Sequence, residues 1–176
     1  MEAKNLVAGT YKVDINHSNV AFKVRHLMIA NVKGQFTNFS GTFTLDDKTL
    51  QSLEGVANIS SVNTNSETRD KHLQSADFFD LQKYPTITLM LDKVKGDIAY
   101  GKLTIRGITK DIEMRFETSG MTVKDPWGSM RAGLSLSGSI SRKDFGLTWN
   151  ETIESGGFIA GDSVIITIEL EGVLGE

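Results

Sequence analysis

The sequence contains no cysteine and only two prolines. Without cysteine the chain has no disulfide, no thiolate nucleophile and no cysteine-ligated zinc site, although this absence leaves the cellular compartment open. The turns of the 176-residue chain therefore depend on its 17 glycines. Common catalytic signatures are also missing, namely the G-x-S-x-G elbow, the P-loop and the G-x-G-x-x-G fingerprint. We expect a protein that is not an enzyme and that uses no cofactor or metal.

Long apolar segments are missing too. No stretch reaches the roughly 18 consecutive apolar residues that a membrane-spanning helix needs. Residues 1–9 lack the basic start and the apolar run of a secretory signal. We therefore expect no integral membrane segment. For the sequence as it stands we expect a cytoplasmic location, or a periplasmic one if a signal peptide was removed.

Charge of one sign is not concentrated in any run. The chain has 19 basic and 22 acidic residues, which give a net charge of −3. This mixture does not predict nucleic-acid binding, and no polybasic segment indicates an anionic membrane. The length and the hydrophobic content of 39% fit one domain over residues 1–176.

Alternation of apolar and polar residues is the dominant pattern that the sequence does contain. Val20, Phe22 and Val24 alternate with Lys23 and Arg25. The same period of two recurs in residues 39–45, 87–91, 103–105, 112–116, 132–140 and 164–170. Many strands at hairpin spacing predict a sandwich or a barrel, and a closed barrel leaves no exposed edge. A barrel of about eight strands holds either packed side chains or one small ligand, and periodicity does not distinguish the two.

One segment, residues 64–85, has the character of a helix. Thr64 and Glu67 fit a capping box, and Pro85 ends the segment before the next strand. We predict a helix near residues 65–76, with minor helical turns elsewhere, that acts as a lid or plug on a barrel. We also predict a long loop from Asp144 to Gly161.

Four separated motifs resemble those of one family. They are Y-K-V-D-I-N-H-S with V-A-F-K-V-R-H-L (residues 11–27), R-D-K-H-L-Q-S-A-D-F-F-D-L-Q-K-Y-P (69–85), G-K-L-T-I-R-G-I-T (101–109) and I-S-R-K-D-F-G-L (140–147). In this order they resemble the YceI-like family of polyisoprenoid-binding, lipocalin-like proteins. The resemblance implies an all-β fold, an elongated, antiparallel, eight-stranded lipocalin-like β-barrel whose apolar interior takes one amphiphilic chain. It also implies a homodimer.

The resemblance suggests which residues would hold that chain. The residues expected to line the barrel are Phe22, Val24, Phe36, Phe39, Phe43, Leu73, Phe78, Phe79, Leu89, Leu103, Leu134, Phe145, Trp149 and Phe158. Small inward residues such as Gly41, Ala132 and Gly138 would leave volume unfilled. The same apolar residues would equally form a packed core, because core and pocket are built from the same residue types.

Basic residues in these motifs are candidates for the mouth of the barrel. The expected head-group or mouth residues are His17, Arg25, His26, Arg69, His72 and Arg142. An arginine suits a phosphate or a quinone carbonyl through its fixed donor fork. The alternative is that these arginines form internal ion pairs with Asp70, Asp77 or Asp144.

The three histidines do not predict a metal site. His17 and His26 are nine residues apart, so an unbroken strand would place them on opposite faces, and zinc prefers three or four ligands in close order. A bend could still bring them together, with His72 approaching from the helix.

The resemblance thus implies a protein that binds and sequesters or carries a polyisoprenoid, an isoprenoid quinone, a fatty acid or a fatty amide. Two alternatives stay open. One is a lipid-modifying or metal-dependent enzyme that uses His17, His26 or His72. The other is a structural or interaction protein with a filled barrel.

Overall fold

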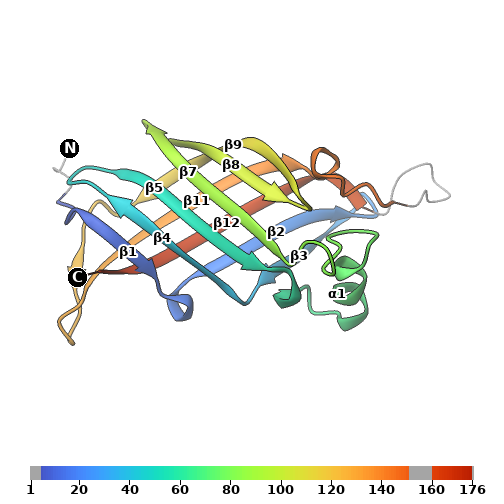
Figure 1. The fold of residues 1–176 in the computed structure, drawn as a ribbon, viewed down its shortest axis with the longest axis horizontal. Coiled ribbons are helices and arrows are strands. Elements are labelled where there is room, and N and C mark those ends of the chain that lie inside the picture. Colours follow the sequence, from blue (N-terminus) through green and yellow to red (C-terminus); the bar gives the residue numbers. More distant parts are fainter. Residues whose placement is uncertain (1–4, 151–159, 176) are drawn as a thin grey trace.

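The computed structural model describes residues 5–150 and 160–175. Eight antiparallel strands form a closed barrel, because the pairing of β11 with β12 joins the two ends of the series. In order around the barrel they are β11 (Met130–Ser141), β9 (Ile108–Thr118), β8 (Ile98–Ile105), β7 (Thr86–Lys95), β5 (Leu50–Asn58), β4 (Phe39–Leu45), β1 (Gly9–Val13) and β12 (Ala160–Leu174). Figure 1 shows the elongated shape. The prediction of an eight-stranded antiparallel barrel is confirmed.

Four further strands extend this barrel. β2 (Asn19–His26) pairs with β12, β3 (Ala30–Phe36) pairs with β2, and β6 (Val62–Asn63) pairs with β3. β10 (Val123–Lys124) pairs with β11. The short 3-10 turns are η1 (Ile15–His17), η2 (Ile59–Ser61) and η3 (Arg142–Phe145).

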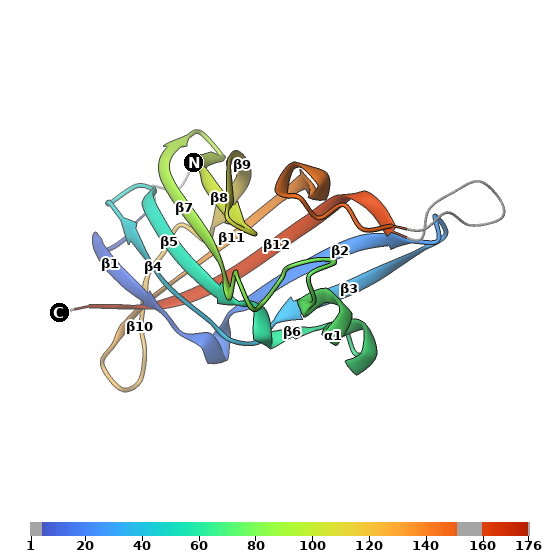
Figure 2. The ribbon, with the colours of Figure 1, turned by 45° about the vertical axis from the view of Figure 1, so that its right-hand side comes forward.

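The long strand β12 has different neighbours along one of its sides. Its residues 160–169 pair with β2, whereas its residues 172–174 pair with β1. The ring of strands is therefore completed by β1 at one end of the barrel, and the β2–β3 hairpin lies beside β12 at the other. The helix α1 (Glu67–Gln74) lies toward the same end as that hairpin (Figures 1 and 2).

Side chains fill the β1 end of the barrel. Tyr11 stacks on Phe43 with ring centroids 5.4 Å apart, and both side chains are buried. Leu50, Leu91 and Leu136 are also fully buried in the same cluster. A smaller cluster of Phe36, Ala57, Ile59 and Val62 lies where β3, β5 and β6 meet. The alternation read from the sequence therefore does place one face of each strand inside.

The helix differs from its prediction at its start. The N-cap is Ser66, whose hydroxyl accepts a hydrogen bond from the Arg69 backbone N–H at 3.3 Å, and not Thr64. Thr64 is buried, and its hydroxyl donates to the Asp70 carboxylate at 2.6 Å. Both Thr64 and Ser66 could cap the helix. Because the Thr64 hydroxyl donates to the Asp70 carboxylate, Ser66 is the residue that caps it. The helix then ends at Gln74, earlier than predicted, and Ser75 continues in an extended conformation.

Within residues 5–150 and 160–175, no helix has the length and apolar character needed to cross a bilayer.

Candidate functional site

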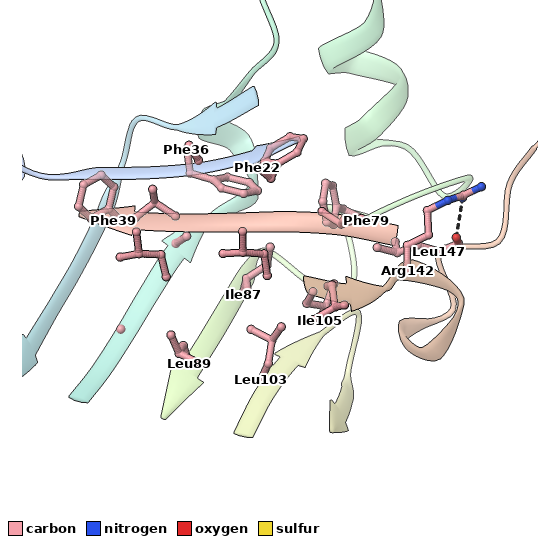
Figure 3. Close-up of a pocket in the computed structure, with 18 of the residues that line it drawn as sticks. Phe22, Phe36, Phe39, Phe79, Ile87, Leu89, Leu103, Ile105, Arg142 and Leu147 are labelled. Carbon is pink, nitrogen blue, oxygen red and sulfur yellow. Dashed lines mark hydrogen bonds between the residues drawn. The ribbon is translucent and has the colours of Figure 1, made fainter. Parts of the chain in front are cut away.

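The half of the barrel next to α1 contains a cavity of about 340 Å³ (Figure 3). Its walls come from strands β1 to β5, β7 to β9, β11 and β12, from α1 and the segment that follows it, and from η3 and the residues after it. Nearly all of the groups that face it are apolar. A cavity of this size is within the range of small-molecule sites in proteins.

Two glycines in the wall contribute to the empty space. Gly41 of β4 and Gly55 of β5 lie opposite each other in the strand register, and both line the cavity. A Cβ atom on Gly55 would come no closer than 3.8 Å to another residue's heavy atom, whereas one on Gly41 would lie 2.5 Å from the Glu54 carbonyl oxygen. Glycine is therefore required by the backbone at position 41, but at position 55 it leaves unfilled volume.

Most of the residues predicted to line the barrel do lie at the cavity. Those found in its wall are Phe22, Val24, Phe36, Phe39, Leu73, Phe78, Phe79, Leu89, Leu103 and Trp149. Sequence reasoning missed several others, including Val20, Ile87, Ile105, Ile112, Leu147 and Ile166. The period-two pattern could have identified the strand residues among these, because their inward direction follows from their position.

Three predicted lining residues lie elsewhere. Phe43, Leu134 and Phe145 are buried in the packed cluster and do not face the cavity. Ala132 and Gly138, predicted to leave volume unfilled, do not line it either. For the strand residues among these, alternation tells which side chains point inward, but not at which level along the barrel axis the interior is filled. Phe145 lies in the turn η3, where strand alternation does not apply. Phe158 lies outside the described residues.

Most of the polar residues in the cavity wall are basic. Arg25, His26, Arg69, His72 and Arg142 all line it, and Glu54 is the acidic residue among the described lining residues. His17, predicted to lie at the mouth, is not among them. Because η1 separates β1 from β2, His17 lies beside Asp14 and Glu171, away from the cavity.

Arg142 is the most deeply buried of these basic groups, with 3% of its surface exposed. Its guanidinium donates to four backbone carbonyls, those of Gly161 (2.8 Å), Leu147 (2.7 Å), Trp149 (2.9 Å) and Ala160 (3.3 Å). Burial lowers the pKa of the guanidinium, which the negative charge of Asp162 partly offsets. Backbone carbonyl oxygens hold Arg142, in place of the ion pair with a carboxylate that was the alternative considered from the sequence. Its positive charge lies beside the apolar cavity.

Arg69 is held in a similar way by α1 and the residues before it. Its Nε donates to the Thr64 hydroxyl at 2.7 Å, and one terminal nitrogen donates to the Thr64 carbonyl at 2.6 Å. Asp70 accepts hydrogen bonds from the backbone N–H and the hydroxyl of Thr64. Asp70 therefore orients Thr64, and Thr64 in turn orients Arg69. This indirect arrangement replaces the direct ion pair between Arg69 and Asp70 that was considered from the sequence.

Aromatic rings connect the helix to the segment after η3. The His72 ring lies 5.1 Å from the Phe78 ring and 4.7 Å from the Trp149 ring, and the Phe78 and Trp149 rings are 5.3 Å apart. The His72 Nε2 also lies 2.8 Å from the Asp77 carboxylate. All three rings line the cavity, so they close part of its wall with side chains from two separate segments. The role of the helical segment as a lid stays a prediction.

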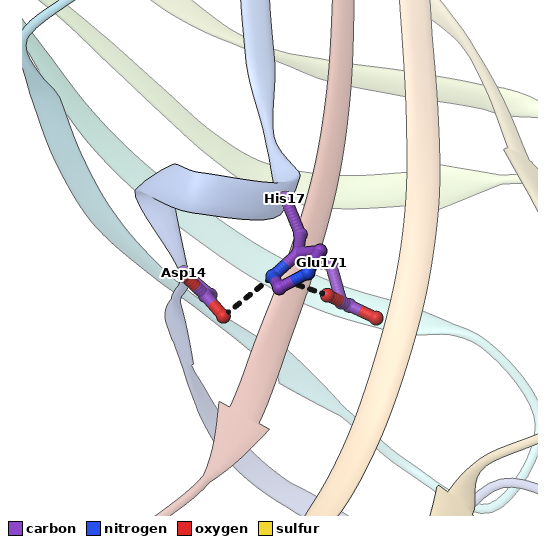
Figure 4. Close-up of side chains that lie close together, drawn as sticks. All are labelled: Asp14, His17 and Glu171. Carbon is purple, nitrogen blue, oxygen red and sulfur yellow. Dashed lines mark hydrogen bonds and ion pairs between the residues drawn. The ribbon is translucent and has the colours of Figure 1, made fainter.

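Asp14, His17 and Glu171 form a polar cluster on the outside of the barrel (Figure 4). The His17 ring nitrogen lies 2.9 Å from Asp14 and 3.3 Å from Glu171. Their ligand atoms lie within 4.8 Å of one another, but Arg131 occupies the same carboxylates, at 2.9 Å from Asp14 and 3.4 Å from Glu171. A guanidinium in this position already supplies the positive charge that a metal ion would bring. We interpret the cluster as an ion-pair network that joins β1, β11 and β12.

Replacement of Asp14 by asparagine should test this network. Hydrogen bonds from Arg131, and then from His17, lower the pKa of Asp14 from 3.8 to about 2. A lowered folded-state pKa stabilises the fold above the unfolded-state pKa, and that contribution is lost as the pH falls from about 4 toward 2. We expect D14N to reduce the free energy of unfolding by about 2 kcal/mol at pH 7. We also expect a smaller loss of stability between pH 4 and pH 2 than in the unmodified protein.

Urea unfolding at pH 7 and at pH 3 measures both effects. The matched control is D111N, because Asp111 pairs with Lys102 at 2.7 Å but its side chain is 88% exposed. Exposed pairs contribute little to stability. Equal effects of the two substitutions would contradict the assigned role of the Asp14 network.

Comparison with known proteins extends these observations. The sequence model of the YceI-like domain matches residues 11–172. A UPF0312 protein of Staphylococcus aureus (strain MSSA476) is 35% identical over 156 residues, which cover 88% of this chain and 91% of that protein.

Solved structures are similar as well. The crystal structure of the Campylobacter jejuni YCEI protein aligns with a TM-score of 0.74 and 36% identity, covering 86% of this chain and 90% of that chain. A polyisoprenoid binding domain from Saccharophagus degradans, implicated in plant cell wall breakdown, aligns with a TM-score of 0.71 over 94% of this chain and 98% of that chain. It is 16% identical, so this likeness is one of fold.

Proposed function

Since this chain belongs to the YceI-like family, we propose that it binds one long-chain amphiphilic lipid in the cavity of its barrel. The observation that carries the proposal is an apolar cavity of about 340 Å³ beside a packed core. A barrel filled along its whole length would have no such space. The name of the Saccharophagus degradans neighbour, a polyisoprenoid binding domain, points to the same class of ligand.

The apolar wall accounts for the affinity that such a ligand needs. Transfer of each methylene from water into an apolar site contributes about 0.8 kcal/mol. About ten methylenes would then contribute roughly 8 kcal/mol before the costs of association are subtracted. Selectivity among chains of similar length should therefore be loose. A polyisoprenoid, an isoprenoid quinone, a fatty acid and a fatty amide all remain within this ligand class.

The basic residues suggest how the head group lies. Arg25, Arg69 and Arg142 line the cavity together with His26 and His72, so a phosphate, carboxylate or carbonyl oxygen would be favoured near them. We infer that the chain of the lipid occupies the apolar part of the cavity and that its head group lies near these cations. Binding of this kind requires no chemical step, and we propose a carrier or sequestering role.

Native mass spectrometry of freshly purified protein, followed by organic extraction, tests the proposal. We expect one amphiphile per chain, either copurified or taken up after incubation with a polyprenyl phosphate, an isoprenoid quinone or a fatty acid. The same spectra report whether the protein is the homodimer that the family resemblance implies. Protein of bare polypeptide mass after all three incubations would overturn the proposal and favour a structural or interaction role.

A further inference from the structure

The tip of the β2–β3 hairpin exposes apolar side chains. The turn consists of Leu27, Met28 and Ile29, and the Met28 and Ile29 residues are 61% and 82% exposed. Figure 2 shows that the hairpin reaches far along the barrel, toward the end at which α1 lies. Single exposed apolar residues are common on protein surfaces, so the exposure needs further support before it carries an argument.

The backbone of this turn supplies that support. Leu27 and Met28 have φ angles of +50° and +63°, and the Ile29 N–H donates to the His26 carbonyl at 3.2 Å. Two consecutive positive φ angles are the φ pattern of a type I′ turn, which strongly favours Asn-Gly and similar pairs. Bulky apolar residues are strained in this conformation, and here they gain little burial in return. The folded chain alone therefore does not account for the choice of residues at the tip.

The stem of the hairpin is basic. Lys23 and Lys33 lie directly opposite each other in the strand register, and Arg25 lies opposite Asn31. Residues 19–36 contain no acidic residue, although the whole chain has a net charge of −3. These cations are distributed over two strands, so they form no run in the sequence. Like charges directly opposite each other destabilise a sheet, and an anionic surface would relieve that repulsion.

The tip is also continuous with the cavity. Val24, Arg25, His26 and Val32, which form the end of the hairpin stem, line the cavity wall. Any surface that the tip contacts is therefore next to the basic part of the cavity.

From these observations we propose that the β2–β3 hairpin docks on an anionic lipid bilayer. Met28 and Ile29 enter the boundary between head groups and acyl chains, while Lys23 and Lys33 lie over anionic head groups. Apolar insertion and attraction of cations to anionic lipids are the two contributions that hold peripheral segments at a membrane. The inference goes beyond the proposed function, because docking needs no ligand in the cavity.

Co-sedimentation with vesicles of phosphatidylcholine and phosphatidylglycerol in equal parts tests the docking. We expect the double variant M28S/I29S to bind these vesicles at least about tenfold more weakly than the unmodified protein. We expect binding to weaken also with vesicles of phosphatidylcholine alone and at high salt. Sedimentation of the double variant equal to that of the unmodified protein would overturn the proposal, as would the absence of any vesicle binding.

A second variant separates docking from folding. In M28G, glycine replaces methionine at a position with a positive φ angle, which glycine tolerates, so we expect a higher melting temperature. Because the substitution also removes an apolar side chain from the tip, we expect weaker vesicle binding. Unchanged vesicle binding by M28G and by M28S/I29S would contradict the role of the tip. The matched control is W127S, because Trp127 is 85% exposed in the turn between β10 and β11, toward the other end of the barrel (Figure 2). We expect W127S to bind vesicles like the unmodified protein, and a loss as large as that of the tip variants would overturn the assignment.

Two further measurements distinguish this proposal from others. Uptake of a fatty acid added without vesicles should be the same in M28S/I29S and in the unmodified protein. If neither protein took up the fatty acid, the proposed function would be contradicted but membrane docking would not. A change of oligomeric mass in the tip variants, with no vesicle binding by any protein, would identify the tip as a contact between two copies and overturn membrane docking.

Discussion

Replacement of Gly55 by leucine is expected to weaken the binding of a long-chain amphiphile by about a hundredfold while the barrel stays folded. A Cβ atom at this position would lie 3.8 Å or more from its nearest neighbours, so the new side chain can extend into the cavity without displacing the backbone. Its four carbons would exclude roughly four methylenes of a ligand, each of which contributes about 0.8 kcal/mol. The sum of about 3 kcal/mol corresponds to about a hundredfold in the dissociation constant.

Isothermal titration with a fatty acid or a soluble isoprenoid measures this effect. The control is G133L, because Gly133 lies in β11, lines no part of the cavity, and has its nearest Cβ contact at 3.6 Å from the Leu170 carbonyl oxygen. We expect G133L to bind the ligand like the unmodified protein. Equal affinity of G55L and G133L would show that the ligand does not occupy the cavity next to Gly55.

Replacement of Arg142 by alanine is expected to lower the free energy of unfolding by about 3 kcal/mol. The substitution removes four hydrogen bonds from a charged donor and leaves the carbonyls of Leu147, Trp149, Ala160 and Gly161 without it. A hydrogen bond to a charged group contributes about 1.5 kcal/mol or more, and recovery of the desolvation cost of the guanidinium offsets part of the loss. These carbonyls belong to the segment after η3 and to the start of β12, so that part of the cavity wall should loosen first.

Chemical unfolding of R142A, compared with R142K, tests the reason as well as the size of the effect. Lysine keeps the charge but lacks the fork that reaches several carbonyls at once, so R142K should remain much less stable than the unmodified protein. The control is R115A, because the Arg115 side chain is 61% exposed and lies 3.5 Å from Asp97. Full stability of R142K would show that charge, and not the geometry of the hydrogen bonds, makes Arg142 important.

Much of the fold could be predicted from the sequence, because the period of two in residues such as Val164, Ile166 and Ile168 directly reports a half-buried strand. The turn at Gly107, which has a φ of +71°, was also predictable from its place between two alternating segments. The start of α1 was not, because both Thr64 and Ser66 are good capping residues. Which of them caps depends on where Asp70 lies in the folded chain.

The sequence could predict which side chains point into the barrel, but not where each of them lies along the barrel axis. Phe39 and Phe43 are both inward residues of β4, yet only Phe39 lines the cavity, because Phe43 stacks on Tyr11 at the filled end. Whether an inward side chain lies at the filled end or at the cavity depends on whether β1 or β2 is the neighbour of β12 at that height of the barrel. No local sequence pattern indicates that pairing. For the same reason the sequence could not show that Arg142 binds carbonyls of residues up to 19 positions away in the chain.

The change of neighbour along β12 also bears on how such a protein can evolve. Residues 172–174 belong with β1 and the filled end, and residues 160–169 belong with β2 and the hollow end. Most of the fully buried side chains lie in the cluster that includes Tyr11, Phe43 and Leu136, so folding stability depends chiefly on that cluster. Substitutions at cavity residues outside that cluster, such as Gly55 and Val24, can then alter the cavity at little cost to the fold. Selection on the lipid can thus act on cavity residues that lie outside this cluster, and one barrel can give rise to descendants with different ligands.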